Sequence, residues 1–299
     1  MAWTFEYLAG PLTLTEGPAW DGSGLFFTDI EASHILRYDP TTNEIATVYE
    51  GTNRANGLVL GPDGRLYACE QRTGTIVRYE RDGARTVLAS RFEGKRLNSP
   101  NDLALDSRGR VWFTDPRYGD QAGRELDHDS VYRLTPTERE GEEWAIERVV
   151  SDTTKPNGLL LSPDERTLYV AQSDHDPARR REFRAYPIGE DGTVGPYRVL
   201  HDFGEHRGID GMCLDSEGNI IAATGWELGG PGSSITVFAP SGEVLERHPF
   251  PVKRPTNCTF GDADLRTLYV TSIEGYLYRA RTERTGYLQP PRQRPWLPG

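Results

Sequence analysis

Six polar residues recur at comparable positions along the 299-residue chain, each just ahead of a short apolar run or within its first residues. They are Glu16, Asn56, Asn101, Asn157, Asp210 and Asn257. Carboxylate and amide oxygens are the ligands that a hard divalent cation such as calcium prefers. Calcium takes roughly 6 to 8 oxygens, so four protein ligands leave positions for water or a substrate oxygen. If these side chains converge, they form a metal site with an open position.

The elements that must position these residues belong to a repeat. The intervals between the six residues are 40, 45, 56, 53 and 47 residues. A complete copy, PNGLLLSPDERTLYV at residues 156–170, combines an apolar run, a turn and an alternating strand, and a second pair of strands follows most copies. A period of roughly 40 to 50 residues with four strands per copy is typical of a β-propeller, one blade per repeat. We therefore predict an all-β protein, with residues 1–299 as one six-bladed propeller of four-stranded antiparallel blades.

In such a propeller the six residues head the innermost strands and converge on the central channel; we call them the ring. Two carboxylates about 5 Å apart repel by roughly 3 kcal/mol at an effective dielectric constant of 20. A cation between Glu16 and Asp210 is therefore expected. The alternative is that the Asn-Gly and Asp-Gly pairs only form turns and bond the backbone locally.

The two ends of the chain have different expected roles. Residues 3–15 contain a possible strand, which we expect to pair with the last blade and close the ring of blades. The tail from Gln289 to Gly299 carries four prolines and is expected to be irregular and exposed.

Loops that follow the second strand of each repeat should lie on the same side as the ring. The longest are predicted to begin at Pro116, Ser173 and Gly225. They offer four candidate side chains for a pocket wall; these are Tyr118, His128, His175 and Trp226. A single loop histidine is more often an exposed polar residue, so neither histidine is assigned a role.

Cations precede several ring positions by two or three residues. They are Arg54, Lys155, Arg207 and Arg254, with Arg96 slightly further from its ring position. On an acidic chain such cations can attract an anionic substrate or hold a carboxylate as it forms. The alternative is that they only balance the acidic ring.

Composition excludes several classes of protein. A net charge of -11 and a pI near 5.1 argue against nucleic-acid binding, which needs basic patches. The sequence has no run of 18 apolar residues and begins without a basic, apolar leader, so neither a membrane span nor a signal peptide is expected. Cys69, Cys213 and Cys258 are predicted to be buried free thiols, which suits a cytoplasmic protein. The oligomeric state is left open.

The segment from Glu93 to Gly119 and the motifs at Glu16, Asn157, Asp210 and Asn257 resemble a known family. It is the gluconolactonase, regucalcin and luciferin-regenerating enzyme family, and the likeness is to its bacterial gluconolactonase-like branch. The resemblance covers roughly residues 12 to 282. It implies a six-bladed propeller with one divalent metal on the channel axis, usually calcium, with magnesium, manganese and zinc as alternatives. The family's ligand pattern maps onto four ring residues, which are Glu16, Asn101, Asn157 and Asp210.

The resemblance also implies an activity. A metal-dependent hydrolase would open a sugar lactone, such as gluconolactone, to the aldonic acid. The cation would polarise the carbonyl, and Asp210 would take a proton from the attacking water. Asn56 and Asn257 are expected behind the ligands, where an amide bonds a ligand oxygen.

Four further residues are expected near the substrate, and these are Arg54, Ser99, Tyr118 and Trp226. Ser99 stands where regucalcin-type members carry arginine, so animal-type sugar recognition is not carried over. Two other functions remain open. One is a phosphotriesterase-like hydrolase that uses the same site, and the other is a non-catalytic, metal-stabilised propeller that binds a ligand.

Overall fold

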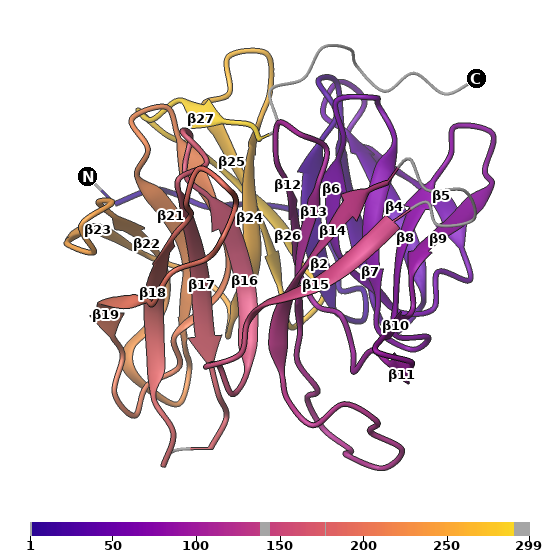
Figure 1. Ribbon diagram of the computed structural model, residues 1–299. Helices are drawn as coiled ribbons and strands as arrows, with labels where there is room; N and C mark the ends of the chain where they lie inside the picture. Colours follow the sequence, from indigo (N-terminus) through magenta and orange to yellow (C-terminus); the bar gives the residue numbers. More distant parts are fainter. Residues whose placement is uncertain (1, 138–143, 177, 290–299) are drawn as a thin grey trace.

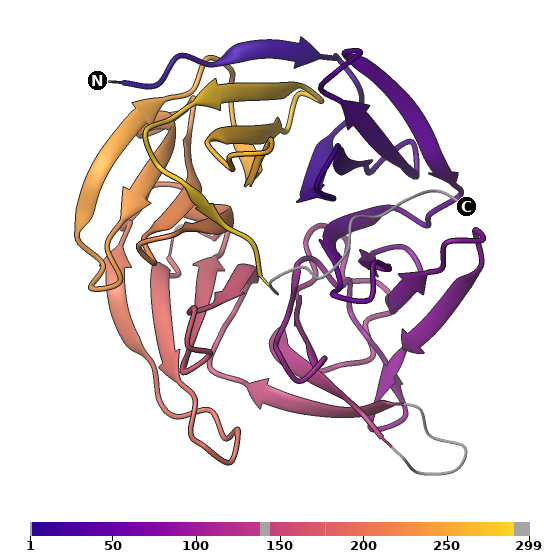
Figure 2. The same ribbon diagram turned by 90° about the horizontal axis from the view of Figure 1, so that it is seen from above.

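The computed structural model describes residues 2–137, 144–176 and 178–289. Within these ranges the strands form six antiparallel blades around a central channel (Figure 1, Figure 2). Each of the first five blades contains four successive strands in up-and-down order, and the sixth combines β24, β25 and β26 with β1 from the start of the chain. The fifth blade gains one short strand, β27, at its inner edge. The predicted six-bladed propeller is confirmed. No helix long and apolar enough to cross a membrane occurs in the described ranges.

The strands are named here from the channel outward, blade 1 to blade 6. The innermost strands are β2 (Thr15–Trp20), β6 (Ala55–Leu60), β12 (Leu103–Leu105), β16 (Pro156–Leu161), β20 (Ile209–Asp215) and β24 (Pro255–Gly261). The second strands are β3 (Leu25–Asp29), β7 (Leu66–Glu70), β13 (Val111–Asp115), β17 (Thr167–Ser173), β21 (Ile220–Trp226) and β25 (Thr267–Ser272). The third strands are β4 (His34–Asp39), β8 (Thr75–Tyr79), β14 (Ser130–Pro136), β18 (Arg181–Pro187), β22 (Gly229–Phe238) and β26 (Leu277–Arg281). The outermost strands are β5 (Glu44–Glu50), β9 (Arg85–Ala89), β15 (Trp144–Val150), β19 (Arg198–Asp202), β23 (Val244–Pro249) and β1 (Glu6–Ala9).

The last blade takes its outer strand from the other end of the chain. Strand β1 pairs antiparallel with β26, as predicted, and Glu6 lies opposite Arg279. Just before β1, the ring of Trp3 stacks on His248 of β23 with centroids 3.7 Å apart. This N-terminal segment therefore joins blade 5 to blade 6 and covers an edge that would otherwise be open.

Near the C-terminus, the short strand β27 (Gly286–Tyr287) pairs with β20 of blade 5. The tail predicted to be irregular begins at Gln289, and residues 290–299 lie outside the described ranges. Ahead of blade 3, two strands of two residues each, β10 (Arg91–Phe92) and β11 (Lys95–Arg96), pair with each other as a separate short hairpin.

The hydrophobic core lies between the blades. Each of the six apolar clusters combines side chains from two neighbouring blades. Between blades 3 and 4, for example, Trp112 and Val131 pack with Leu159 and Val170. Because each blade is covered on both faces, its inner strands are apolar on both sides and not simply alternating. The ring residues are among the polar side chains that are buried within or beside these inner strands.

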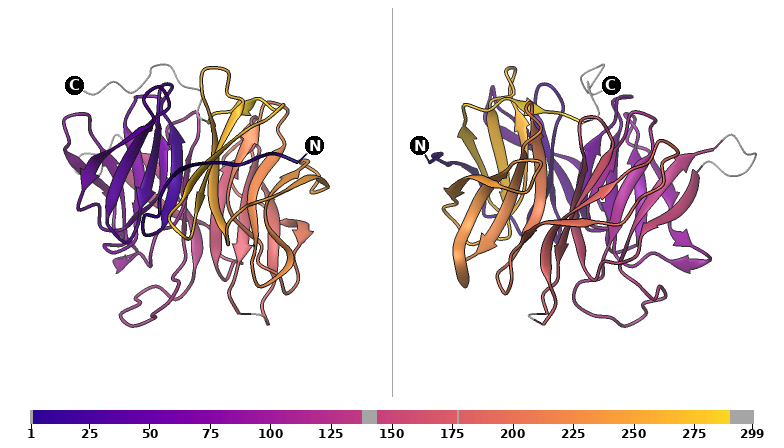
Figure 3. Two further views of the ribbon diagram at one scale, coloured as in Figure 1. Left: turned by 180° about the vertical axis from the view of Figure 1, so that it is seen from behind. Right: turned by 60° about the vertical axis from the view of Figure 1, so that its left-hand side comes forward.

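The loops divide between two faces, as predicted. Thr15 pairs with Asp29, so the loop after β3 returns to the side where Glu16 lies. The long loop at residues 116–129 and the described parts of the loop after β17, at residues 174–176 and 178–180, project from this same face (Figure 1, Figure 3). We call it the mouth face, and the opposite face, where β27 lies, the floor.

The prediction of a third long mouth loop, beginning at Gly225, is wrong. Strands β21 and β22 continue their pairing as far as Trp226 and Gly229, which leaves Glu227 and Leu228 as a two-residue turn. The glycines permit this geometry, since a Cβ on Gly225 would lie 2.0 Å from a backbone oxygen of the facing strand. The Gly-Pro-Gly-Ser run, typical of a loop, here lets two strands approach closely.

All three cysteines are free thiols, as predicted. Cys69 and Cys258 are buried, whereas Cys213 is only partly buried, which corrects the prediction for that residue. The sulfurs of Cys213 and Cys258 lie 3.7 Å apart between blades 5 and 6.

Candidate functional site

A β-bulge accompanies the ring residue in five of the six blades. The pairing of the innermost strand with its neighbour shifts register at that point. The shifts fall between Glu16 and Ala19, Ala55 and Leu58, Pro156 and Leu159, Ile209 and Met212, and Pro255 and Cys258. A bulge bends the strand and re-aims the side chain beside it. The repeat thus aims a polar side chain at the channel from a strand whose other residues pack in the core.

In blade 3 the ring position precedes the strand. The backbone of Asn101 donates to the Thr114 carbonyl at 2.9 Å, and Thr114 donates to the Asp102 carbonyl at 3.0 Å. These two bonds extend the sheet beyond β12. Asn101 and Asp102 are thereby held beside the channel by β13.

The glycines after the ring residues allow neighbouring blades to touch. A Cβ on Gly158 would lie 2.2 Å from the carbonyl oxygen of Asp210, and one on Gly211 would lie 2.0 Å from Cγ of Asn257. Neither glycine has a positive φ angle, so close approach and not turn geometry requires them. The Asn-Gly and Asp-Gly pairs are therefore not hairpin turns; they sit where one blade meets the next.

Replacing Gly158 by alanine is expected to displace the backbone at Asp210, because a backbone oxygen cannot yield as a flexible side chain can. We expect a loss of about 1 to 3 kcal/mol in the free energy of unfolding, as for other overpacked sites, measured by urea denaturation. Gly229→Ala is the matched control, since its Cβ would meet nothing closer than 3.7 Å. Equal stability of the two variants would contradict the close approach.

Four ring residues are joined to one another or to their surroundings by hydrogen bonds. Oε2 of Glu16 accepts from the Gly17 amide at 2.7 Å and from Nδ2 of Asn257 at 3.0 Å. Nδ2 of Asn157 donates to the Tyr118 hydroxyl at 3.1 Å. Asp210 accepts a hydrogen bond from Nη2 of Arg207. The remaining two ring residues, Asn56 and Asn101, are also buried, and their side chains make no hydrogen bond in the described ranges.

The ring carboxyl groups lie close enough to affect one another. Burial raises the pKa of Glu16 well above its usual range, and the nearby Asp210 and Asp102 raise it further. Burial also raises the pKa of Asp210, which Arg207 and Asn157 partly oppose. The predicted convergence of Glu16 and Asp210 on the channel thus has an electrostatic consequence. Without a positive charge between them, the two groups resist being ionised together.

The prediction from sequence missed a third buried carboxyl group, that of Asp102. Burial and the neighbouring Asp210 raise its pKa to about 7, although Leu103 and Asn257 donate to it. The Leu103 amide lies 2.9 Å from Oδ1. The signal was present, since Asp102 directly follows Asn101. Strict strand alternation, however, places consecutive side chains on opposite faces, whereas these two residues precede the strand.

The donor set fits a hard cation. No group of three or more His, Cys, Asp or Glu side chains in the described ranges could hold a metal ion, so such a site needs amide oxygens as well. Oε1 of Glu16 and the side-chain oxygens of Asn101 and Asn157 accept no hydrogen bond from the described residues. Together with Asp210 they offer two carboxylates and two amides, which suit calcium and neutralise it. A divalent cation would also relieve the repulsion that raises these pKa values.

The raised pKa of Asp102 predicts a pH dependence of stability in protein kept free of divalent metal. The folded pKa of about 7 exceeds the ordinary value near 3.9, so the folded state binds the proton more tightly between these limits. The contribution of Asp102 to the free energy of unfolding is fully present below about pH 4 and is lost as the pH rises toward 7. Between pH 5 and 7 we expect a loss of roughly 2 kcal/mol, at 1.4 kcal/mol per pH unit where the two states differ by a full proton.

Urea denaturation with a chelator present, at pH 5 and pH 7, measures this loss. Asp102→Asn removes the titrating group, so the variant should lose less stability than the wild type over the same interval. Identical pH dependence of both proteins would contradict the assignment.

On the floor side of the ring the channel becomes apolar. A cavity of about 110 Å³ is lined there by apolar side chains such as Leu58, Leu159 and Met212, together with Asp102 and Asn257. Tyr287, Leu288 and Gln289 line it as well. Asn257 thus borders this floor-side cavity, whereas the side chain of Asp210 is 14% exposed.

The candidate wall residues differ in their relation to the ring. Tyr118 contacts it directly, through Asn157, and its hydroxyl donates to the Ser173 carbonyl at 3.3 Å. The His175 ring is tilted by 35° against the Tyr118 ring with centroids 4.8 Å apart, and burial lowers the pKa of His175. Trp226 is half-buried under the guanidinium of Arg254, and its indole nitrogen is buried without a hydrogen bond.

Three other candidates point to different partners. The backbone of Ser99 donates to Asp115 at 2.8 Å. Arg54 is paired with Glu31, and His128 contacts Ser130 at 2.9 Å. Neither Arg54 nor Ser99 makes a hydrogen bond to a ring side chain.

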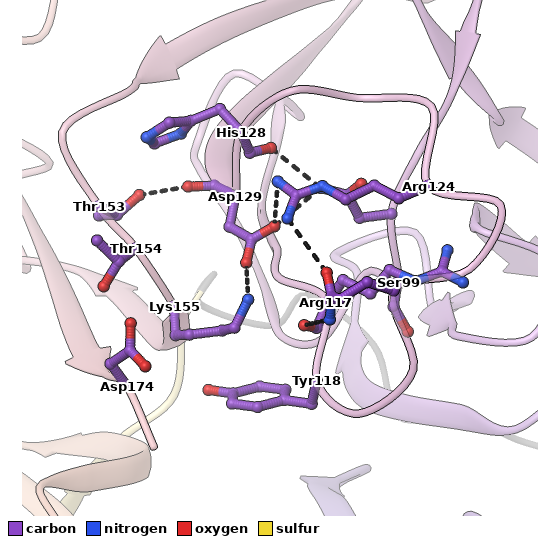
Figure 4. A network of polar contacts seen from close by, with 12 residues as sticks. Ser99, Arg117, Tyr118, Arg124, His128, Asp129, Thr153, Thr154, Lys155 and Asp174 are labelled. Carbon is purple, nitrogen blue, oxygen red and sulfur yellow. Dashed lines mark hydrogen bonds and ion pairs between the residues drawn. The ribbon is translucent and has the colours of Figure 1, made fainter. Parts of the chain in front are cut away.

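A second cavity of about 450 Å³ lies between the two long mouth loops. Its wall contains the buried carboxylate of Asp129, which pairs with Lys155 and with Arg124 (Figure 4). Lys155 precedes the ring residue Asn157 by two residues. The charges in this wall are largely matched to one another, so it is a polar surface close to the ring but separate from it.

Comparison with known proteins adds independent evidence. Residues 14–274 match a family model described as SMP-30/Gluconolactonase/LRE-like region. A gluconolactonase from Zymomonas mobilis is 30% identical over 309 residues, covering 94% of this chain and 82% of that protein. The pentonolactonase XacC from Haloferax volcanii is 31% identical over 269 residues, covering 88% and 82%. A solved gluconolactonase from Xanthomonas campestris has 31% identity and a TM-score of 0.81, covering 93% of this chain and 89% of that one.

Proposed function

The chain belongs to the SMP-30/gluconolactonase/LRE-like family, and from this premise we propose that it is a metal-dependent lactonase that opens a sugar lactone to its aldonic acid. The observation that carries the proposal is the convergence of Glu16 and Asp210 on one channel. Both carboxyl groups are strongly affected by burial, and amides accompany them. Relatives named gluconolactonase and pentonolactonase favour an aldonolactone as the substrate class.

The proposed ligands of the cation are Glu16, Asn101, Asn157 and Asp210. Calcium is the first choice, because the donors are all oxygens and carry two negative charges. When bound, the cation supplies Lewis acidity toward the lactone carbonyl. Asn257 supports the ligand set through its hydrogen bond to Glu16, which fixes one carboxylate oxygen and leaves the other free.

Asp210 is the proposed general base. A base must be ionised before it accepts a proton, and Arg207 favours the ionised form of Asp210 by donating a hydrogen bond to it. The proton of the attacking water passes to the carboxylate of Asp210 as the new C–O bond forms at the carbonyl carbon. The bond from that carbon to the ring oxygen then breaks, and the ring oxygen takes the proton back from Asp210 to become the hydroxyl of the aldonic acid.

The mouth side supplies the groups for recognition of the sugar. Tyr118 holds Asn157 through its hydroxyl and presents its ring beside His175. Trp226 is half-buried beneath the guanidinium of Arg254, and its indole nitrogen is buried, so Tyr118 is the wall candidate in direct contact with the ring.

The test of the function is a lactone panel with five- and six-membered sugar lactones, followed by acid release at constant pH and corrected for spontaneous hydrolysis. Protein treated with a chelator is assayed first, and calcium, magnesium, manganese and zinc are then restored in turn. Hydrolysis that depends on a restored metal supports the proposal. A paraoxon-type ester assayed in parallel distinguishes a phosphotriesterase, and no hydrolysis of any lactone with any metal would overturn the proposal.

A further inference from the structure

The cations that precede the ring in the sequence have different partners in the structure. Arg54 pairs with Glu31, Lys155 with Asp129, and Arg254 with both carboxylate oxygens of Glu227 at 3.0 Å. Arg96 donates to backbone carbonyls of the preceding blade. Each of these cations is therefore matched by a group outside the ring.

Arg207 is paired with the ring itself. Its Nη2 donates to Oδ2 of Asp210, and its Nη1 donates to the carbonyls of Gly225 at 2.9 Å and Pro255 at 3.3 Å. The side chain is 12% exposed. Contacts to blades 5 and 6 thus fix the guanidinium beside the ring. Its Nε and the second hydrogen of Nη2 make no hydrogen bond in the described ranges.

The charge of the site changes during the proposed reaction. A lactone is neutral, whereas the acid it yields is a carboxylate at neutral pH. The charges of Glu16, Asp210 and one divalent cation sum to zero. The positive charge of Arg207, held beside them by its backbone contacts, is then available to balance the carboxylate of the product. A guanidinium also matches a carboxylate geometrically, because it offers parallel N–H donors.

We propose that Arg207 binds the carboxylate of the aldonate formed by lactone opening and is the residue that gives the site its affinity for sugar acids. That the anion is an aldonate rests on the proposed function. That a guanidinium lies beside the ring rests only on the observed contacts of Arg207. The same residue also orients Asp210, so the experiment must separate the two roles.

Measuring the affinity for gluconate by calorimetry separates these two roles of Arg207. The neutral polyol glucitol is the comparison ligand, and the affinity for each ligand is measured once with calcium and once with a chelator. Arg207→Met keeps most of the length of the side chain and removes its charge. Arg207→Lys keeps the charge but removes the parallel N–H donors of the guanidinium. We expect gluconate affinity to fall at least about tenfold in Arg207→Met and less in Arg207→Lys, in line with a lost charge-assisted contact of 1.4 kcal/mol or more. The affinity for glucitol should not change.

Arg279→Met is the matched control, since Arg279 is paired with both carboxylate oxygens of Glu6 in the outer strands of blade 6. This variant is expected to bind gluconate as the wild type does. Inhibition of lactone hydrolysis by gluconate gives a second measurement. Its inhibition constant should rise about tenfold in Arg207→Met, with a smaller change in KM for the neutral lactone.

Unchanged gluconate affinity in Arg207→Met, with or without a fall in kcat, would overturn the proposal, because Arg207 would then act on Asp210 alone. Absence of gluconate binding by the wild-type protein would overturn it too. Failure of the proposed function has a different signature: gluconate would bind through Arg207 although no lactone is hydrolysed. Near-UV circular dichroism of Arg207→Met and the intermediate behaviour of Arg207→Lys ensure that a folding defect is recognised.

Discussion

Asp210→Asn is expected to hydrolyse gluconolactone at least about a thousandfold more slowly than the wild type. General-base catalysis contributes typically 10² to 10⁴ in rate, and this carboxylate is also a proposed metal ligand. The amide keeps the shape of the side chain and one oxygen, but it cannot take a proton from water. Its contact with Arg207 also weakens, because the charge that the guanidinium faces is gone.

The measurement is acid release at saturating calcium, with calcium binding to the variant followed separately. Asp164→Asn is the matched control, because Asp164 lies in the turn between β16 and β17 on the floor side and is expected to leave the rate unchanged. Wild-type turnover by Asp210→Asn with calcium bound would remove Asp210 from the role of base. The lactonase would then need another base.

The architecture could be predicted from the sequence because it is repetitive. Six copies of an apolar run, a turn and an alternating strand limit the fold to a propeller, and the copies place Glu16 and Asp210 on one axis. The closing contact of β1 with β26 also follows from the repeat, since the last blade lacks an outer strand of its own. Periodicity therefore determined which backbone positions meet.

The partners of the side chains could not be predicted in the same way. Arg54 and Arg207 stand in similar positions before the ring, yet one is paired with Glu31 and the other with Asp210. The difference depends on loop geometry and on contacts between residues of different blades. Sequence spacing therefore indicated a cationic rim but not which of its members reaches the ring.

Local backbone geometry explains the other discrepancies. The bulges at the ring and the extension before β12 break strict alternation, which is why Asp102 lies in the channel next to Asn101. The glycines near Gly225 resemble a loop in sequence, yet in the structure they allow close contact between paired strands. In each case the residue type was visible, but its role depended on a neighbour distant in the sequence.

Removal of divalent metal is expected to abolish lactone hydrolysis and to lower the stability of the protein at pH 7. The raised pKa values of Glu16, Asp102 and Asp210 mean that the channel favours protons when no cation is bound. A cation that binds only the folded state stabilises it by about 2.7 kcal/mol at 100 times its Kd. Calcium should therefore raise the thermal midpoint of chelator-treated protein, and the rise should increase with pH as the carboxyl groups ionise.

Glu16→Gln tests whether the ring is the site of this effect. The variant loses one of two ligand charges while keeping an amide oxygen, so we expect a much smaller rise in midpoint with calcium and at least a hundredfold loss of activity at equal calcium. At pH 7 without metal, Glu16→Gln should be no less stable than the wild type, because it removes a buried group whose ionisation is unfavourable.

Glu31→Gln is the matched control on the same face, since Glu31 pairs with Arg54 outside the ring. An equal rise in midpoint for Glu16→Gln and the wild type would place the cation elsewhere, and full activity of the wild type in chelator would exclude a metal from the reaction.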